Sequence, residues 1–137
     1  MRRIIAIIVG TLIAFALIAG FEAASSGLYP ISGDIAATDH DTLVALVASI
    51  PLPAKLIVVA GWLLAPFAGG WLCLRIGDWP TGGWIVAGLF LAAGLIEQFS
   101  FPHPPWMQLA SVVLPLLGGW LAQRLHQKPY PGEPLLG

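Results

Sequence analysis

Four apolar segments, each long enough to cross a bilayer, constrain this chain more than any other feature of its sequence. Spanning the hydrocarbon core as a helix takes roughly 20 mainly apolar residues. The segments that approach this length cover about residues 4–24, 52–76, 82–99 and 106–125. Backbone donors and acceptors find no water in hydrocarbon, so a segment can cross it only as a helix or within a closed barrel. The alternation of a barrel is absent, and we therefore expect four helices.

The composition agrees with a membrane protein. Hydrophobic residues make up 58% of the 137 residues and charged residues only 9%, whereas soluble domains carry about 25% charged residues. A soluble domain of this size leaves too much of its chain exposed to hide so much apolar surface. We expect an all-α membrane protein with one four-helix bundle over residues 1–126, surrounded by the lipid bilayer. Without a basic patch, nothing indicates binding to nucleic acid.

The basic residues predict how the bundle is oriented. Cytoplasmic loops carry an excess of Lys and Arg. If the N-terminus is cytoplasmic, only Lys55 lies on the outer side, and the others lie inside: Arg2, Arg3, Arg75, Arg124 and Lys128. We therefore expect a multi-pass protein of the cytoplasmic membrane with both termini in the cytoplasm. The proline-rich residues 127–137 are expected to form a flexible cytoplasmic tail.

The first segment could be mistaken for a secretory signal. Its apolar run from Ile4 to Phe21 is longer than the 7–15 residues usual for such signals, and Glu22 spoils the adjoining small-residue site. We therefore expect a first transmembrane helix here, with a signal peptide as the less favoured alternative.

The outer connection, residues 25–51, is the only long one between the predicted spans. Residues 25–33 contain serine, glycine and proline and favour turns. From Asp41 on, apolar residues recur at helical spacing: Leu43, Val44, Leu46, Val47 and Ile50. Two interpretations remain open, a short amphipathic helix in the outer interface and a lid packed over the bundle.

A short motif occurs in two of the predicted helices. Residues 66–75 and 115–124 align without a gap at Pro, Gly, Gly, Trp, Leu and Arg. Adjacent glycines let membrane helices approach closely, so we expect a helix-packing role for Gly69, Gly70, Gly118 and Gly119. Parallel duplication of a helix pair would explain the match. Shared demands of packing and orientation would explain it as well, and the sequence leaves both explanations open.

Two prolines lie inside predicted helices. Pro66 and Pro115 each lack a backbone donor, which frees the carbonyl groups of Trp62 and Ser111 four residues earlier. We expect kinks at both prolines. Such kinks either bend the bundle structurally or provide a hinge beside a widened cavity.

Two carboxylates near the outer ends of the first and third spans are the main candidates for chemistry. A carboxylate at membrane depth is costly and indicates a function by default. Glu22 and Glu97 could share a proton or a cation in an outward-facing vestibule, with His103 at the same mouth. Aromatic residues follow Glu97, which makes it the stronger candidate of the two. The alternative is that both carboxylates are solvated among lipid headgroups.

No other pattern predicts a catalytic, metal or cofactor site. Asp39, His40 and Asp41 contain ligand-type side chains and could line the outer mouth, but adjacent residues point in different directions and no second cluster has metal-ligand spacing. A solvated helix cap explains them better. Cys73 alone cannot form a disulfide within the chain. We expect no metal and no cofactor.

Several short motifs carry a resemblance to a known group of proteins. They are Glu22 followed by Tyr29-Pro30, Ser49-Ile50-Pro51, Gly61-Trp62, Phe67-Ala68-Gly69-Gly70 and Pro102-His103-Pro104-Pro105-Trp106. At these positions the chain resembles a group of uncharacterised bacterial proteins with four membrane helices. The resemblance extends to about Leu125 and implies a bacterial cytoplasmic-membrane protein. The group carries no established activity to transfer.

The sequence predicts a role without catalysis. The leading hypothesis is an accessory or structural membrane component that packs through glycine-rich faces against itself or against another membrane protein. The alternative is a small oligomeric transporter or channel for an ion, a proton or a small solute, with Glu22, Glu97 and His103 as its outer site. An enzyme acting on lipid-soluble substrates is a third class that no motif favours.

Overall fold

The computed structural model describes residues 1–31 and 39–126. In that part of the chain it contains helices and no strand, in the order α1 (Arg2–Leu28), α2 (His40–Ser49), α3 (Leu52–Gly77), α4 (Gly82–Ser100) and α5 (Pro105–Leu125). The four helices other than α2 are long and apolar enough to cross a membrane. The four predicted spans are thus confirmed as helices. The predicted tail at 127–137, like residues 32–38 of the long connection, lies outside the described residues.

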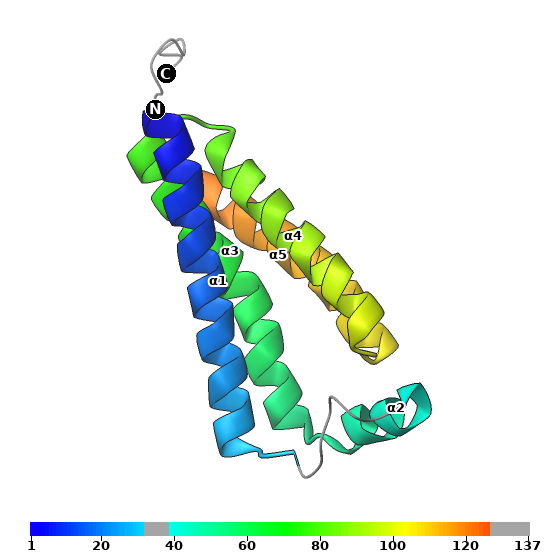
Figure 1. Ribbon diagram of the computed structural model, residues 1–137. Coiled ribbons are helices and arrows are strands. Elements are labelled where there is room, and N and C mark those ends of the chain that lie inside the picture. Colours follow the sequence, from blue (N-terminus) through cyan, green and yellow to red (C-terminus); the bar gives the residue numbers. More distant parts are fainter. Residues whose placement is uncertain (32–38, 127–137) are drawn as a thin grey trace.

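The long helices form two pairs that diverge like the arms of a V (Figure 1). One pair is α1 with α3, and the other is α4 with α5. The pairs meet at the end where α1 begins and α5 ends, which we call the closed end. They separate toward the opposite end, the open end, beside which α2 lies. Helix α3 is central, since it packs against α1, α4 and α5.

Small residues bring the helices together near the closed end. A Cβ atom added to Gly10 of α1 would lie 2.5 Å from the carbonyl oxygen of Gly69 on α3, and one added to Gly82 of α4 would lie 2.9 Å from the sulfur of Cys73. Toward the open end, Gly20 and Gly94 have no such neighbour within 4 Å. Close approach needs residues without bulk at the contact, so the packing of Gly82 on α4 against Cys73 on α3 helps to hold the two arms together at the closed end.

The outer surface of the bundle is strongly apolar. Only 17% of the most apolar window of α1 is buried inside the protein, against 39% for α3. Large side chains such as Ile4, Leu12 and Leu109 are more than half exposed. Contiguous apolar surface of this kind is rare on soluble monomers, whereas lipid tails are as apolar as leucine. The helices therefore indicate a membrane protein.

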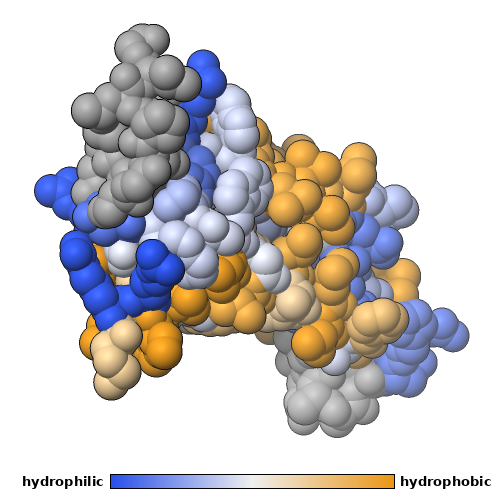
Figure 2. Space-filling model, turned by 90° about the horizontal axis from the view of Figure 1, so that it is seen from above, coloured by the Kyte–Doolittle hydropathy of each residue, from blue (hydrophilic) through white to orange (hydrophobic). Residues whose placement is uncertain are grey.

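Arginines and tryptophans gather at the closed end. The arginines lie over indole rings in three pairs: Arg3 over Trp79, Arg75 over Trp71 and Arg124 over Trp120. Arg2 donates a 2.6 Å hydrogen bond to the carbonyl oxygen of Ile76 and lies 4.0 Å from the carboxylate of Asp78. Figure 2, which looks onto this end, shows hydrophilic residues beside broad apolar flanks.

One prediction about the outer connection was wrong. Residues 25–28 were expected to form turns, but they continue α1 to Leu28. Ser25 is buried, and its hydroxyl group donates a 3.0 Å hydrogen bond to the carbonyl oxygen of Ala54 near the start of α3. This bond satisfies the serine without breaking the helix. The first residue that cannot continue the helical hydrogen bonds, Pro30, comes only after α1 has ended.

Candidate functional site

A cleft lies between the two helix pairs toward the open end and contains two adjoining chambers. The deep chamber has a volume of 290 Å³ and is enclosed by residues of α1, α3, α4 and α5. The mouth chamber, of 240 Å³, lies nearer α2. Glu22, Glu97 and His103 line both chambers. The residues singled out in the sequence are therefore brought together at the junction of the two chambers.

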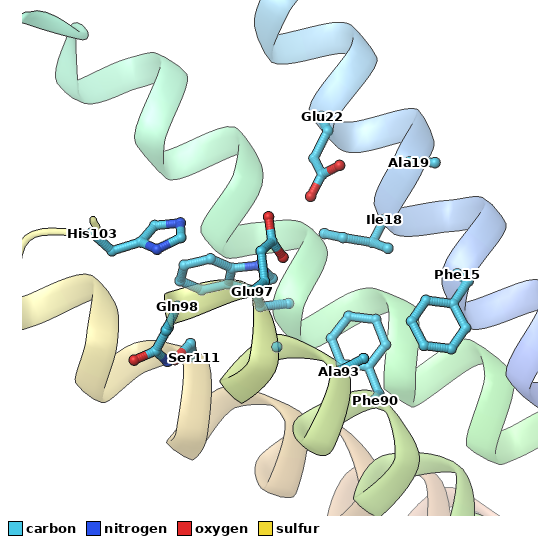
Figure 3. Close-up of a pocket in the computed structure, with 12 residues that line it drawn as sticks. Phe15, Ile18, Ala19, Glu22, Phe90, Ala93, Glu97, Gln98, His103 and Ser111 are labelled. Carbon is cyan, nitrogen blue, oxygen red and sulfur yellow. Dashed lines mark hydrogen bonds between the residues drawn. The ribbon is translucent and has the colours of Figure 1, made fainter. Parts of the chain in front are cut away.

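Aromatic rings form the wall of the deep chamber. Phe15 on α1 and Phe90 on α4 stack with their ring centroids 5.8 Å apart and their planes at 28°. Trp62 of α3 also lines the chamber and is almost completely buried. Figure 3 shows the two phenylalanine rings side by side, deeper in the cleft than the two glutamates. Most of this surface is thus apolar, and the polar groups lie at its mouthward end.

The two glutamates extend from opposite walls of the cleft. Glu22 comes from α1 and Glu97 from α4, and Figure 3 shows their carboxylates pointing toward each other. Among the described residues, neither carboxylate forms an ion pair or a hydrogen bond. Lys55 of α3 is the basic residue that lines the mouth chamber. A pair of like charges facing across a cavity favours a cation or a proton between them.

Helical spacing explains why these side chains share the cleft. Glu22 lies seven positions after Phe15 on α1, and Glu97 lies seven positions after Phe90 on α4. Positions seven apart lie on one face of a helix, two turns from each other. Each helix thus presents one phenylalanine and one glutamate to the cleft.

The lining residues of the deep chamber form pairs between the two halves of the chain. The two halves can be aligned by placing Phe15 of α1 on Phe90 of α4 and Pro66 of α3 on Pro115 of α5. In this alignment the paired lining residues are Phe15 with Phe90, Ile18 with Ala93, Ala19 with Gly94, Glu22 with Glu97, and Trp62 with Ser111. Gln98 and His103 are the lining residues without a counterpart in the lining. The phenylalanine-to-glutamate spacing is visible in the sequence, but the residues predicted for the site did not include Phe15, Phe90 and Gln98.

The two glutamates differ in their burial within the protein. Glu22 is half-buried, whereas Glu97 is exposed. Phe99, one of the aromatic residues that follow Glu97, is itself 93% exposed. The preference for Glu97 rests on its expected depth in the membrane and stays a prediction.

His103 lies in the turn between α4 and α5. Its ring makes edge-to-face contacts with Trp62, at 5.5 Å between ring centroids, and with Phe101, at 5.4 Å. The Nδ1 atom is buried and has no hydrogen-bond partner among the described residues. Burial lowers the pKa of His103 below its ordinary value, and the nearby carboxylate of Glu97 opposes this shift. The imidazole is therefore neutral at pH 7.

A hydrogen-bonded pair joins the two helices of the second arm at the chamber wall. Gln98 of α4 donates from Nε2 to the hydroxyl oxygen of Ser111 on α5. Ser111 in turn donates a 2.8 Å hydrogen bond to the carbonyl oxygen of Gln108. These contacts fix the polar part of the chamber wall formed by α4 and α5.

The prolines and glycines of the repeated motif lie inside the bundle. Pro66 and Pro115 are both buried within helices that continue past them. The residues whose carbonyl groups they leave without a helical donor, Trp62 and Ser111, line the deep chamber. The free carbonyl groups thus belong to cleft residues, one on each arm.

The four motif glycines are packed against other helices. In α3, Gly69 faces Gly10 and Ala14 of α1, and Gly70 faces Gly83 of α4 and Ala122 of α5. In α5, Gly118 faces Leu63, Pro66 and Phe67 of α3, and Gly119 faces Ala87 and Trp84 of α4. The aligned glycines thus have different partners, since the first of each pair faces α1 in one copy and α3 in the other. The closed end is therefore less symmetric than the deep chamber.

The acidic segment ahead of α2 stands apart from the site. Asp39, His40 and Asp41 are exposed and do not line either chamber. Thr42 donates a hydrogen bond of 2.5 Å to Asp39, which lowers the pKa of that carboxyl group. In the same helix, Val47 is buried, and Val47 and Ile50 line the mouth chamber. Helix α2 thus adds its apolar face to the rim of the cleft.

The charged side chains that line the deep chamber are the two carboxylates. Within residues 1–31 and 39–126, no group of three or more His, Cys, Asp or Glu side chains could hold a metal ion. Ser111 is bonded to Gln98 and Gln108, and His103 is packed between aromatic rings. The groups free to meet a ligand are the two carboxylates.

Comparison with known proteins adds no relative to this picture, since no protein-family model, no curated protein and no solved structure matches the chain. The family resemblance therefore stays a prediction from its short motifs.

Proposed function

We propose that this chain is a small membrane transporter that takes up a proton or a cation in the cleft between its two arms. The observation that carries this proposal is the pair Glu22 and Glu97, which face each other across a chamber and have no basic partner within ion-pair distance among the described residues. Ionisable groups inside membrane proteins mark the paths of ions and protons. His103 lines both chambers together with the two glutamates.

The closed end is proposed to face the cytoplasm of a bacterial cell. In support, Arg2, Arg3, Arg75 and Arg124 belong to the helix ends that meet there, whereas Lys55 lies near the start of α3 at the open end. Basic residues concentrate on the cytoplasmic side. In this orientation both termini are cytoplasmic and the cleft opens toward the outer side.

We also propose that the two arms arose by duplication of a helix pair. The matched residues of the deep chamber support this origin, because they come from the same positions of each arm. The different partners of Gly69 and Gly118 would then reflect later divergence at the closed end. The common ancestor of the two arms would have been a single helix pair with one phenylalanine and one glutamate. Two copies of this helix pair together would have formed the site.

The closed end limits what one copy can do alone. Tightly packed glycines fill it, so the cleft is open at one end only. Transport across the membrane therefore needs the arms to move relative to each other or a second copy to complete the path. A homo-oligomer is part of the proposal for this reason.

Proton flux in proteoliposomes tests the transport proposal. Purified protein is reconstituted with a pH-sensitive dye inside the vesicles, and a gradient of a monovalent cation is applied, first sodium or potassium and then an organic ammonium ion. We expect the gradient to drive a proton flux that is lost in Glu97→Gln and in Glu22→Gln. Asp41→Asn is the matched control, since Asp41 is an exposed carboxylate outside both chambers. Absence of flux under every gradient, or flux unchanged in both glutamate variants, contradicts the proposal.

A second candidate function is that of an accessory subunit, which another observation favours. Gly20 on α1 and Gly88 on α4 have open space where a Cβ would lie, and uncovered glycines in membrane helices are typical of contact faces. Co-purification in a mild detergent tests this function. A stable complex with another membrane protein would support it, and a protein that purifies alone as a monomer would exclude it.

A further inference from the structure

We propose that the cleft binds one amphiphilic organic cation, meaning a quaternary or protonated amine that carries a flat apolar group. This inference rests on the proposed function and names its substrate class. The charged centre lies between Glu22 and Glu97, and the apolar group lies in the deep chamber against Phe15 and Phe90. The pairing of residues across the cleft gives the cation equivalent partners on both sides.

The charges of the cleft set the charge of the ligand. Counted as formal charges with histidine neutral, Glu22 and Glu97 contribute two negative charges and Lys55 contributes one positive charge. The net formal charge of the cleft is therefore about minus one. A single monovalent cation, or one proton, neutralises it. A second positive charge on the ligand would meet Lys55 at the mouth and be repelled.

The aromatic wall sets the apolar part of the ligand. An inorganic ion keeps its water or needs several oxygen ligands, and the deep chamber offers it phenylalanine and tryptophan faces instead. An organic cation loses much less hydration, and its charge is attracted to aromatic faces within about 6 Å. The stacked pair Phe15 and Phe90 and the nearly buried Trp62 line the same chamber as the two carboxylates.

The size of the chambers limits the ligand to a small molecule. The deep chamber measures 290 Å³, at the lower limit of the roughly 300–1,000 Å³ typical of ligand pockets. A single ring with a quaternary ammonium group suits this volume. The adjoining mouth chamber of 240 Å³ leaves a route for entry past Lys55 and the rim of α2.

Titration calorimetry on the full chain in detergent tests this inference with three probes. Benzyltrimethylammonium has the ring and a charge that does not depend on pH, tetramethylammonium has the charge alone, and benzyl alcohol has the ring alone. We expect measurable binding of benzyltrimethylammonium and binding weaker by at least about tenfold for each of the other two. Equal binding of benzyltrimethylammonium and benzyl alcohol overturns the inference, because the charge would then contribute nothing.

Substitutions test whether the probe binds in the cleft. Glu22→Gln with Glu97→Gln should weaken benzyltrimethylammonium binding by at least about tenfold. Phe90→Ala removes a ring that packs against the apolar group, so it should weaken benzyltrimethylammonium binding by about threefold to tenfold and tetramethylammonium binding by less. Asp41→Asn is the matched control and should bind as the unmodified chain does. A thermal unfolding midpoint measured on each variant identifies any that fail to fold. Binding that is unchanged in the folded double glutamine variant overturns the inference.

The flux assay separates this inference from the function on which it rests. Glutamate-dependent proton flux without binding of benzyltrimethylammonium overturns the ligand class and leaves transport intact. Glutamate-dependent binding without any flux overturns transport and supports the ligand class. Absence of both overturns both proposals.

Discussion

Gly118 on α5 lies so close to α3 that a Cβ atom added to it would be 2.6 Å from the carbonyl oxygen of Leu63. The ring of Pro66 lies on the same side, with its Cγ atom 3.2 Å from that Cβ position. The crossing of α3 and α5 therefore depends on one glycine that meets the proline-containing turn of the central helix. This crossing holds the two arms together on the closed-end side of the cleft.

Replacing this glycine should destabilise the bundle. Gly118→Ala forces α5 away from the backbone of α3, and overpacking of this kind costs about 1–3 kcal/mol. Thermal unfolding in detergent measures the effect. The matched control is Gly88→Ala on α4, where a Cβ has open space and alanine should be neutral or stabilise the helix by up to about 1 kcal/mol. Equal midpoints for the two variants would contradict the packing role of Gly118.

The bond between Gln98 and Ser111 should contribute measurably to stability. Ser111→Ala removes the acceptor of Gln98 and leaves that amide without its partner across the two helices. Hydrogen bonds between membrane helices contribute about 0.6–2 kcal/mol, so the unfolding free energy should fall by that amount. The control is Ser49→Ala, since Ser49 bonds only within exposed α2. An effect at Ser111 no larger than at Ser49 would argue against this contact.

His103 should make stability depend on pH. Burial lowers the pKa of His103 in the folded chain below the ordinary 6.5, so between these two values the unfolded chain binds more protons than the folded one. The contribution of the neutral imidazole is fully present above about pH 6.5 and declines as the pH falls toward the lowered pKa. We expect the unfolding midpoint to drop with acidification over that window. His103→Gln should flatten the drop, and His40→Gln, at the exposed start of α2, should not.

The same histidine is coupled to Glu97. The carboxylate opposes the effect of burial on the pKa of His103, so Glu97→Gln should lower that pKa further. NMR titration of the imidazole in detergent measures the change directly. An unchanged or higher pKa in this variant would mean that the two side chains do not interact across the junction of the chambers.

Thiol labelling tests the proposed orientation. Cys73, which is only 1% exposed, should leave the unmodified chain unlabelled by a membrane-impermeant maleimide. In intact bacterial spheroplasts, a cysteine at His40→Cys beside the open end should react. A cysteine at Thr81→Cys, in the exposed turn at the closed end, should react only after the membrane is permeabilised. The opposite pattern would mean that the closed end faces outward.

The sequence by itself determined the number, the position and the helical nature of the four spans. The length and hydropathy of a segment can be read from its own residues. Because the hydrocarbon core has a fixed thickness and contains no water, a segment that is long and apolar enough to cross it must be a helix of about that length. The predicted starts of the second and fourth spans, residues 52 and 106, agree within one residue with the starts of α3 and α5. The end of α1 was mispredicted because the bond from Ser25 to Ala54 is a contact between helices, which no local pattern shows.

Only the tertiary structure decided which faces of these helices meet and therefore what the cleft contains. In a soluble protein, the apolar face of a helix indicates the core. In a membrane, lipid tails are as apolar as leucine, so Phe90 in the cleft and Leu89 on the outer surface look alike in the sequence. The sequence could name Glu22, Glu97 and His103 one by one, because charge at membrane depth is conspicuous. Their meeting at one junction depends on contacts between helices, such as that of Gly61 with Phe21 beside Glu22, and these contacts are properties of the packed bundle.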